Sequence, residues 1–490
     1  MNTIQRIAKN TLFLMGSNII GFVLSFFFLM YTTRYLGSDS YGILSFAIAF
    51  SSITIFLADI GIGSVIIRDI ARDKQLTAKY FGNSILLKII LAIITLLVTA
   101  AIGYVFNYPY STMSVVYIIT LSLILTSFQG VITSIIQACE LMEYIAIGSV
   151  IYNIFMLIFA LTAISLKWNV EEFAYVYLIS SIVLALYYLF VSSRRIPSPK
   201  YEVDLAFWSY LIKEAIPFGL SSVFVRVYYY IDTIMISLII SNPNEVMGWY
   251  NAAYRMVLIL SFIPLTFLNS IYPIMSKSYV TSNQYLSFMF ERSFKYLMAL
   301  AIPIGVGTTV LANRIILFVY GGDFTSSTIA LQILVWSEVL IFLNTTFGNL
   351  LNSINRQMVV TKQTMLAATL NIILNLFLIP KYSYVGASIA TVSTELFAFF
   401  FLLHFVSKEG YRLPVNIIKS CFKIVLATAI MYLFLEISNM IPLLLLIALS
   451  AILYLLIIYF ANILDREDLH MIKQLLLRPK GNREERVKNN

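Results

Sequence analysis

The sequence predicts an all-α polytopic membrane protein with about fourteen transmembrane helices, arranged as two parallel six-helix lobes and two further C-terminal helices. Hydrophobic residues make up 60% of the 490 residues and charged residues only 12%, whereas soluble domains carry about 25% charged residues. The apolar residues come in runs of about 20, the length that an α-helix needs to cross a bilayer. Lys and Arg residues are unevenly divided between alternate connections of these runs, as membrane topology requires.

Each apolar run is expected to form a helix, because lipid offers no partner for unpaired backbone groups, and barrel strands would be only about 10 residues long. The first run, Thr11 to Thr33, is too long for the apolar region of a signal peptide, so we interpret it as a retained helix. The predicted spans cover residues 11–33, 42–67, 83–106, 112–137, 145–166, 173–192, 211–240, 248–273, 293–312, 327–353, 360–380, 384–407, 414–435 and 441–463.

The basic residues predict that both termini are cytoplasmic. Of the 33 Lys and Arg residues, 26 fall in the two tails, in the loops on one side or at the span ends that adjoin these loops, four fall in the loops on the other side, and three lie deeper inside spans. Basic residues are retained on the cytoplasmic side, and one wrongly counted helix would blur this separation. The net charge of +9 is therefore explained by membrane topology, and no nucleic-acid partner is expected. The loops are all too short to form a soluble catalytic domain.

An internal repeat predicts the domain organisation. The segment from Lys9 to Gly42 has a basic start, a helix rich in small residues and a Tyr-Gly turn, and Lys213 to Gly248 repeats this order six helices later. An even repeat unit inserts both copies in the same orientation, which predicts parallel lobes with a cavity between them. The expected divisions are an N-lobe at 1–200, a C-lobe at 201–408, two helices at 409–463 and a basic cytoplasmic tail at 464–490. The tail is interpreted as an orienting segment, with anionic lipid or a partner as the alternative.

No metal or organic cofactor is expected from the sequence. Cys139 and Cys421 both fall near predicted cytoplasmic helix ends, where a disulfide is disfavoured. His404 and His470 are far apart and lack the further ligands that a zinc site needs.

Several motifs in sequence order resemble the polysaccharide-exporter branch of the multidrug/oligosaccharidyl-lipid/polysaccharide superfamily, which includes the Wzx-type flippases. The resemblance covers roughly residues 1–407. The chain departs from the family pattern at Ser383, where the family usually has glycine, which puts the local turn geometry in question. The motifs are Arg34-Tyr-Leu-Gly37 with Tyr41-Gly42, Asp59-Ile-Gly-Ile-Gly63 with Arg68, Ala215-Ile-Pro-Phe-Gly219 with Asp232, Asn371-Ile-Ile-Leu-Asn375 running to Pro380-Lys-Tyr, and Gly386-Ala-Ser-Ile-Ala-Thr391.

The resemblance implies a MATE-like fold and alternating access between two lobes, with a polyprenyl-(pyro)phosphate-linked oligosaccharide as cargo in surface polysaccharide biosynthesis. It implies a multi-pass protein of the cytoplasmic membrane, in contact with membrane lipids and possible polysaccharide-assembly proteins, that transports rather than catalyses. Coupling to a proton or sodium gradient is a further possibility. Two alternatives stay open: a cation-coupled drug or metabolite antiporter of the same superfamily, and a membrane-embedded glycan polymerase or acyltransferase. A cationic cavity would favour the flippase, and an acidic one the antiporter.

Three charged residues lie too deep in their predicted spans to reach the membrane surface easily: Arg226, Glu338 and Glu395. Such residues usually face a bundle interior or a wet cavity. The fork of an arginine suits phosphate oxygens, so we expect Arg226 to hold the cargo phosphate. Glu338 or Glu395 would then be coupling sites. The alternative is that Arg226 pairs with one of these glutamates and serves the fold.

Asp232 and Arg255 lie at similar predicted depths on consecutive antiparallel helices, about 10–12 Å from the outer surface. We therefore expect a salt bridge between them, structural in role, with gating as the alternative. Arg255 is also a candidate for substrate binding in the cavity, and Asp232 is a candidate for coupling or gating.

Arg34, Lys88 and Asp59 complete the candidate set. Arg34 ends the first span and is either a cation at the cavity rim or a charge at a helix C-terminus. Lys88 is close enough to the cytoplasmic end of its span to extend to the interface, or else contributes a cavity cation. Asp59 precedes a glycine pair that permits bending or close packing and is a coupling or gating candidate.

Overall fold

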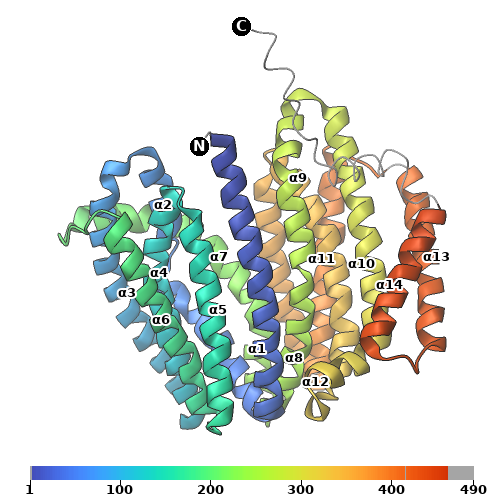
Figure 1. Cartoon of the computed structure of the whole chain (residues 1–490), viewed down its shortest axis with the longest axis horizontal. Coiled ribbons are helices and arrows are strands. Elements are labelled where there is room, and N and C mark those ends of the chain that lie inside the picture. Colours follow the sequence, from blue (N-terminus) through green and yellow to red (C-terminus); the bar gives the residue numbers. More distant parts are fainter. Residues whose placement is uncertain (1–2, 414, 462–490) are drawn as a thin grey trace. The chain divides into compact units, whose positions relative to one another are not determined.

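A computed structural model describes residues 3–413 and 415–461, and every regular element within them is helical (Figure 1). The tail predicted at 464–490 lies outside the described residues. The first half contains α1 (Thr3–Thr54), η1 (Ile55–Ala58), α2 (Ile62–Arg72), η2 (Lys74–Leu76), α3 (Thr77–Val105), α4 (Tyr110–Ala138), α5 (Met142–Ser165) and α6 (Val170–Arg195). The second half contains α7 (Leu205–Ile239), α8 (Pro243–Leu260), α9 (Phe262–Thr281), α10 (Asn283–Val319), η3 (Gly322–Phe324), α11 (Ser327–Ser353), α12 (Gln357–Lys408), α13 (Val415–Ile437) and α14 (Leu443–Phe460).

The described residues contain fourteen potential membrane crossings, the number predicted. Twelve helical stretches are long and apolar enough to cross a bilayer. Two of them, Phe13–Ala58 and Gln357–Lys408, have 46 and 52 residues, more than twice the ~20 that one crossing needs. The helix reverses inside each, at Gly37 (φ 68°) in α1 and at Ser383 (φ 53°) in α12. Ser383 therefore adopts a positive φ that glycine reaches more easily. The turn is thus formed with serine at the position where the family usually has glycine.

The chain folds into two units of packing. Unit 1 comprises residues 3–259, 316–334 and 358–398. Within it α1 packs along α4 and α5, α6 lies against α4 and α5, and α7 contacts α1 and α2 (Figure 1). The short α2 shows why these helices associate: Ile62, Val65, Ile66 and Ile70 repeat at helical spacing and are fully buried. They pack against buried residues of α4 such as Ile135.

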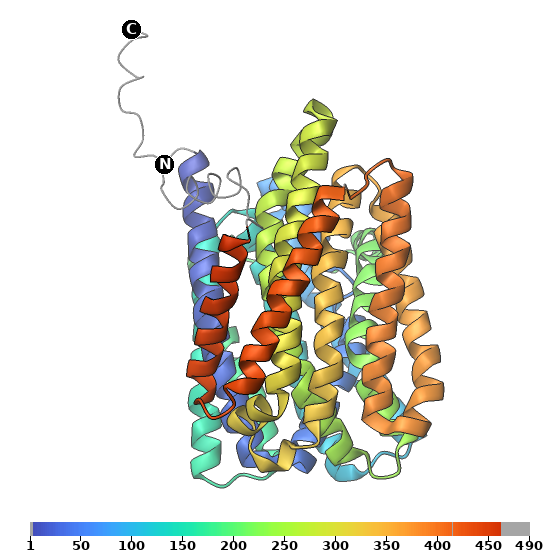
Figure 2. The same ribbon diagram turned by 90° about the vertical axis from the view of Figure 1, so that its right-hand side faces the viewer.

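Unit 2 comprises residues 260–315, 335–357 and 399–461, apart from residue 414. Helices α13 and α14 form an antiparallel hairpin (Figure 2). Ile424, Ala427 and Met431 form one buried stripe of α13 within the core that also includes Leu446 of α14. The Tyr454 hydroxyl donates to the Ala299 carbonyl at 2.7 Å and so joins α14 to α10. The lobe boundaries predicted from the repeat, at residues 200 and 408, stay a prediction.

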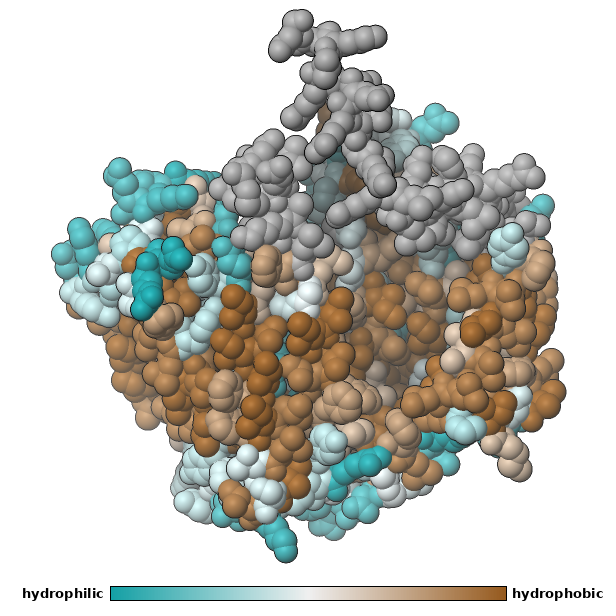
Figure 3. Space-filling model, viewed as in Figure 1, coloured by the Kyte–Doolittle hydropathy of each residue, from teal (hydrophilic) through white to brown (hydrophobic). Residues whose placement is uncertain are grey.

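Lipid contact explains the exterior of unit 1. In Figure 3, apolar side chains form a belt over α3, α5 and α6 between more polar ends. Ile93 and Leu97 of α3 and Leu186 of α6 belong to the exposed large hydrophobic residues, with exposures of 53%, 65% and 61%. In water such a continuous apolar face would promote aggregation, whereas in a bilayer it is the expected surface.

Close backbone packing makes Gly82 of α3 intolerant of a side chain. A Cβ atom there would lie 1.8 Å from the Lys200 carbonyl oxygen, whereas a Cβ at Gly130 of α4 would meet nothing within 4 Å. We expect Gly82→Ala to lower the free energy of unfolding by about 1–3 kcal/mol through overpacking. Gly130→Ala, the matched control, should be neutral or slightly stabilising. Thermal unfolding of the purified protein in detergent measures both, and equal midpoints for the two variants would contradict the packing at Gly82.

Two exposed tyrosines test the predicted orientation. Tyr110 begins α4 in a predicted outer loop and Tyr201 lies in a predicted inner loop, with exposures of 85% and 65%. In a background with Cys139→Ser and Cys421→Ser, we expect Tyr110→Cys to react with a membrane-impermeant maleimide on intact cells. Tyr201→Cys should react only after permeabilisation. The reverse pattern would place both termini on the outer side.

Candidate functional site

A cavity of about 360 Å³ lies within unit 1, lined mainly by α1, α4 and α5, with contributions from α6, α7 and α8. Its lining combines aromatic rings with hydroxyl and amide groups. The polar and charged lining residues are Ser25, Thr32, Tyr41, Ser52, Ser122, Tyr152, Asn153, Tyr177, Tyr230 and Arg255. Among the residues that line this cavity, all in the described part of the chain, Arg255 alone carries a charge. The cavity is therefore cationic, aromatic and rich in hydroxyl groups.

Arg255 of α8 lies among tyrosine side chains. Tyr41, Tyr152, Tyr177 and Tyr230 line the same cavity. A tyrosine hydroxyl is polar but uncharged, so these side chains do not cancel the positive charge of Arg255, which remains available to an anion. The buried Thr32 hydroxyl makes no hydrogen bond within the described residues and also lines this cavity. Together these groups can bind an oxyanion and the hydroxyls attached to it.

Asp232 of α7 is bound by neutral groups, so the predicted salt bridge to Arg255 is wrong. Tyr250 donates to its Oδ2, and Thr391 donates to the same oxygen at 2.8 Å. Asn375 Nδ2 donates to Oδ1 at 2.5 Å. The predicted depth did not fix which way each side chain points: on α8, Tyr250 and Arg255 are five residues apart and so project roughly 140° from one another. Tyr250 faces Asp232, whereas Arg255 faces the cavity.

The cluster around Asp232 is rich in oxygen atoms. Asp232, Asn371, Asn375 and Thr391 are each at most 4% exposed. Asn375 Nδ2 also donates to Asn371 Oδ1 at 3.0 Å, while Asn375 Oδ1 has no hydrogen-bond partner among the described residues. A buried acceptor left unpaired beside a carboxylate is a reason to look for a bound ion or proton. Carboxylate, amide and hydroxyl oxygens are ligands that hard cations prefer.

The two deep glutamates lie in different units. Glu395 of α12 is 7% exposed and accepts a hydrogen bond from Tyr228 of α7. Tyr228 lies four residues before Asp232 on α7, and Glu395 lies four residues after Thr391 on α12. The Tyr228–Glu395 pair is therefore one helical turn away from the Asp232–Thr391 pair along the same α7–α12 contact. Glu338 of α11 is 1% exposed and accepts from the Ser261 hydroxyl in unit 2, at 2.8 and 2.9 Å.

Arg226 lies beside the cavity rather than in its lining. Its Nη1 donates to the carbonyl oxygen of Ser52 at 3.5 Å, and Ser52 is a lining residue. Arg34 is exposed, and its Nε donates to the Val319 carbonyl at 3.0 Å. It also donates to the Phe318 carbonyl, so Arg34 caps the C-terminus of α10 rather than that of its own helix. The role predicted for Arg226 in phosphate binding stays a prediction.

Lys88 does not extend to the interface as its position suggested. Its side chain is 2% exposed, and Nζ donates to Asp59 Oδ1 at 2.9 Å, to the Ser127 carbonyl at 2.9 Å and to the Ser127 hydroxyl at 2.6 Å. Three oxygen partners inside unit 1 replace the water that the ammonium group would find at the surface. Asp59 lies where η1 ends, just before Gly61 (φ 94°) begins the turn into α2.

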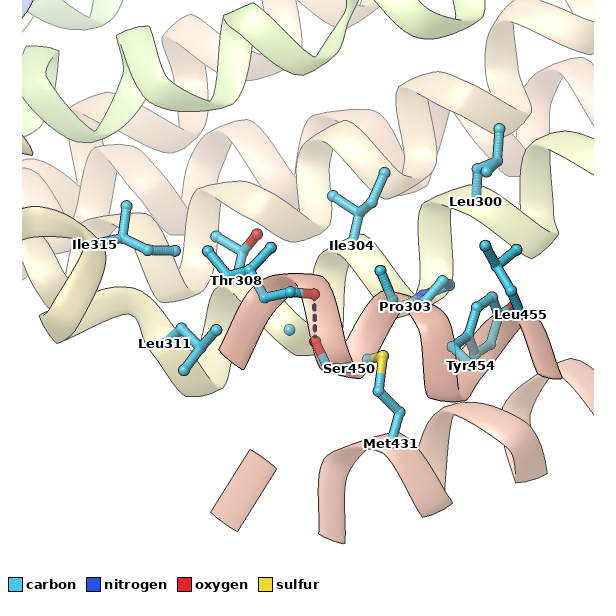
Figure 4. Close-up of a pocket in the computed structure, with 13 residues that line it drawn as sticks. Leu300, Pro303, Ile304, Thr308, Leu311, Ile315, Met431, Ser450, Tyr454 and Leu455 are labelled. Carbon is cyan, nitrogen blue, oxygen red and sulfur yellow. Dashed lines mark hydrogen bonds between the residues drawn. The ribbon is translucent and has the colours of Figure 1, made fainter. Parts of the chain in front are cut away.

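A second cavity, of about 330 Å³, lies in unit 2 between α10, α13 and α14 (Figure 4). Its lining is largely apolar, with Leu300, Pro303 and Ile304 on α10 facing Tyr454 and Leu455 on α14. The Ser450 hydroxyl is already bonded within α14, to the Ile447 carbonyl at 2.9 Å. This cavity suits a hydrocarbon chain and offers little to a charged group.

Sequence reasoning did not assign the tyrosines around Arg255 or the partners of Asp232 to a site. Tyr41 and Tyr177 are far apart in the chain, and nothing local shows that they meet. Asn371, Asn375 and Thr391 did carry a signal, because two amides four residues apart in an apolar helix indicate one shared polar face. No group of three or more His, Cys, Asp or Glu side chains suited to a metal ion occurs in the described part of the chain.

Solved structures with the same fold are membrane transporters. The lipid II flippase MurJ, in an inward closed conformation, aligns with a TM-score of 0.75 over 96% of this chain and 100% of that chain, at 16% identity. A multidrug resistance MATE family transporter of the MOP superfamily, in an inward-facing conformation, aligns with a TM-score of 0.62 over 79% of this chain and 95% of that chain, also at 16% identity. These alignments confirm the predicted MATE-like fold with its additional C-terminal helices.

Curated relatives are archaeal membrane proteins. The chain is 24% identical over 408 residues to the probable low-salt glycan biosynthesis flippase Agl15 of Haloferax volcanii, covering 82% of this chain and 84% of the relative. It is 26% identical over 329 residues to the uncharacterized membrane protein MJ1068 of Methanocaldococcus jannaschii, covering 64% of this chain and 60% of the relative. Residues 7–279, more than half of the chain, match the family described as polysaccharide biosynthesis protein. The predicted resemblance is thus confirmed, and this multi-pass membrane protein belongs to the polysaccharide biosynthesis protein family.

Proposed function

We propose that this protein is a flippase that moves a polyprenyl-(pyro)phosphate-linked oligosaccharide across the cytoplasmic membrane by alternating access. The observation that carries the proposal is the cavity of unit 1, where one unneutralised arginine is surrounded by tyrosines and hydroxyl groups. Family membership and the similarity to a probable glycan biosynthesis flippase support it. The class of transport follows from the chemistry of the cargo: its glycan phosphate cannot cross lipid unaided, whereas its lipid chain can stay in the bilayer.

The cavity residues suit the two polar parts of this cargo. Arg255 presents a planar fork that can donate to two phosphate oxygens and stays charged at any cellular pH. Tyr152, Tyr177 and Tyr230 offer ring faces for sugars and hydroxyls that bond to sugar hydroxyls. Arg226, which reaches the backbone of Ser52 at the cavity wall, would add a second positive charge to the same field. The apolar cavity of unit 2 suits a lipid chain.

The lining disfavours the competing functions. A cavity that bound cationic drugs would need carboxylates, and no Asp or Glu lines this one. Asp59 is engaged by Lys88, while Asp232 and Glu395 bond to groups along the α7–α12 contact. A polymerase or acyltransferase would need nucleophile and base groups arranged around a reacting atom, whereas this lining offers one guanidinium, hydroxyls and an amide.

Substitution of Arg255 tests the proposal. In proteoliposomes loaded with a fluorescent polyprenyl-pyrophosphate oligosaccharide, we expect Arg255→Ala to slow flipping by roughly tenfold or more, because a charge-assisted contact to phosphate is lost. Arg255→Lys keeps the positive charge but lacks the planar guanidinium, so its flipping rate should lie between that of the unsubstituted protein and that of Arg255→Ala. Arg226→Ala should produce a smaller loss. Lys381→Ala, which removes an exposed charge that does not line the cavity, is the control. Flipping at the normal rate by Arg255→Ala would contradict phosphate binding at this residue.

We further propose that a cation, Na⁺ or a proton, binds at Asp232 and couples transport to an ion gradient. The buried Asp232 carboxylate accepts hydrogen bonds from the neutral side chains of Tyr250, Asn375 and Thr391. Such a carboxylate is unfavourable as an anion, and a bound cation or proton would relieve that cost. Asn375 Oδ1 and Asn371 Oδ1 lie beside it as further ligands, and rotation of the Asn375 amide would turn its oxygen toward Asp232. Glu395, one turn away, is the second coupling candidate.

Ion binding can be measured apart from transport. If Na⁺ is the ligand, replacing K⁺ by Na⁺ should raise the unfolding midpoint of the purified protein, because a ligand that binds only the folded state stabilises it. Asp232→Asn and Asn375→Ala should both abolish the rise. If a proton is the ligand, Na⁺ should have no effect, and flipping should respond to a pH gradient in the native protein but not in Asp232→Asn. Responses that survive in Asp232→Asn would exclude this cluster as the coupling site.

A further inference from the structure

Asn153 places an amide on the wall of the unit 1 cavity, at the middle of α5. No other Asn or Gln occurs in this helix, whose remaining residues are mostly apolar. An amide at this depth costs free energy unless its hydrogen-bonding groups are satisfied. The partners of Asn153 therefore show which of its groups serve the fold and which remain for a ligand.

The protein engages half of the hydrogen-bonding capacity of this amide. Oδ1 accepts from the Ser25 hydroxyl of α1 at 2.8 Å, and Nδ2 donates to the Ser149 carbonyl of α5 at 2.8 Å. An amide oxygen can accept two hydrogen bonds, and an amide nitrogen can donate two. One acceptor position and one N–H therefore have no partner within the described residues, on a half-buried side chain that lines the cavity.

Two phenyl rings flank Ser25, the partner of this amide. Phe22 and Phe26 precede and follow Ser25 on one face of α1, and all three line the cavity. Gly21 lets α1 approach α5 closely, because a Cβ atom there would lie 3.3 Å from Asn153 Nδ2. Ring faces beside a donor and an acceptor suit a sugar, whose C–H groups pack against the rings while adjacent hydroxyls bond to the amide.

The size of the cavity limits how much of the cargo this wall can contact. Its volume of about 360 Å³ is near the lower end of the range of about 300–1,000 Å³ for small-molecule sites. Such a space suits a phosphate with the sugar linked to it, rather than an entire oligosaccharide. With the phosphate at Arg255, the linked sugar is the part of the cargo that can contact Asn153. The rest of the lining is uncharged, which suits a neutral sugar.

We propose that Asn153 is a specificity-determining residue that recognises a neutral sugar with two adjacent hydroxyls, linked directly to the cargo phosphate. This inference rests on the proposed function. One sugar hydroxyl accepts from Nδ2 and its neighbour donates to Oδ1, while the sugar ring packs against Phe22 and Phe26. The bonds to Ser25 and Ser149 hold the amide ready for these contacts. Arg255 binds the phosphate with or without a sugar, whereas Asn153 distinguishes the two lipids.

Binding of two kinds of probe separates these roles. One probe is polyprenyl phosphate, and the others are polyprenyl phosphates that carry a single glucose, galactose, mannose or N-acetylglucosamine. Equilibrium binding to the purified protein in detergent gives a dissociation constant for each probe. We call the sugar advantage the ratio of the dissociation constant of polyprenyl phosphate to that of the tightest-binding glycosylated probe.

We expect a sugar advantage of at least ~5-fold in the unsubstituted protein, the factor that about one net hydrogen bond contributes. Asn153→Ala should reduce the advantage below about twofold, and should leave binding of polyprenyl phosphate within about twofold. Asn153→Leu keeps most of the side-chain volume without the polar groups and should give the same result, even if the alanine variant folds poorly. Arg255→Ala should weaken binding of all probes by a similar factor and leave the sugar advantage in place.

Tyr35→Phe is the matched control for a purely structural role. The Tyr35 hydroxyl donates to the Trp168 carbonyl at 2.8 Å and joins α1 to the loop after α5, but Tyr35 does not line the cavity. Tyr35→Phe and Asn153→Ala each remove one hydrogen bond that holds α1, so their unfolding midpoints should fall by similar amounts. Only Asn153→Ala should lose the sugar advantage.

Three results would overturn the inference. They are the absence of a sugar advantage for every glycosylated probe, an advantage that survives in Asn153→Ala and Asn153→Leu, and an equal loss in Tyr35→Phe. Each of these leaves the proposed function standing if Arg255→Ala weakens binding of polyprenyl phosphate. If Arg255→Ala binds polyprenyl phosphate as tightly as the unsubstituted protein does, the proposed role of Arg255 fails, and the Asn153 variants still decide whether Asn153 recognises the sugar.

Discussion

Arg255 is a guanidinium that shares its cavity with four tyrosines and no carboxylate, and the properties of the cavity depend on this arrangement. A charged group inside a membrane protein is costly unless polar neighbours replace its water. A carboxylate partner would meet that cost and also cancel the charge. Tyrosine hydroxyls offset part of this cost of burial and leave the positive charge in place, so the cavity can attract an anion. The rest of unit 1 positions these tyrosines, which come from α1, α5, α6 and α7.

The separation of Asp232 from Arg255 gives unit 1 two polar sites of opposite character. Had the two side chains paired, as their similar depth suggested, each would have neutralised the other. The structure instead turns Asp232 toward Tyr250, Asn375 and Thr391, and leaves Arg255 to the cavity. Both sites involve α8, since Tyr250 and Arg255 lie on this helix about one and a half turns apart. A rotation or shift of α8 would therefore move a residue of each site, and this shared helix offers a physical route for coupling between the two sites.

Backbone contacts through glycine determine how closely the helices of unit 1 approach. Gly61 and Gly219 bring the break between η1 and α2 against α7, while Gly42 and Gly248 bring α1 and α8 together on the opposite side. Such contacts are close and specific in shape, but they involve few hydrogen bonds, so they can separate as units. The buried Lys88–Asp59 pair reinforces the break before α2 from within. The scaffold thus combines rigid, hydrogen-bonded clusters with contacts that depend on shape alone.

The sequence by itself determined the all-helical membrane fold, the fourteen crossings and the deep placement of Arg226, Glu338 and Glu395. These features follow from composition and helical length, because the bilayer imposes one thickness and one demand on backbone pairing. Only the tertiary structure decided which side chains meet: Lys88 turned inward to Asp59, Arg34 capped α10, and Tyr41 came to line the same cavity as Arg255. Depth along a helix can be counted in residues, whereas the direction and partner of a side chain depend on how helices distant in sequence pack together.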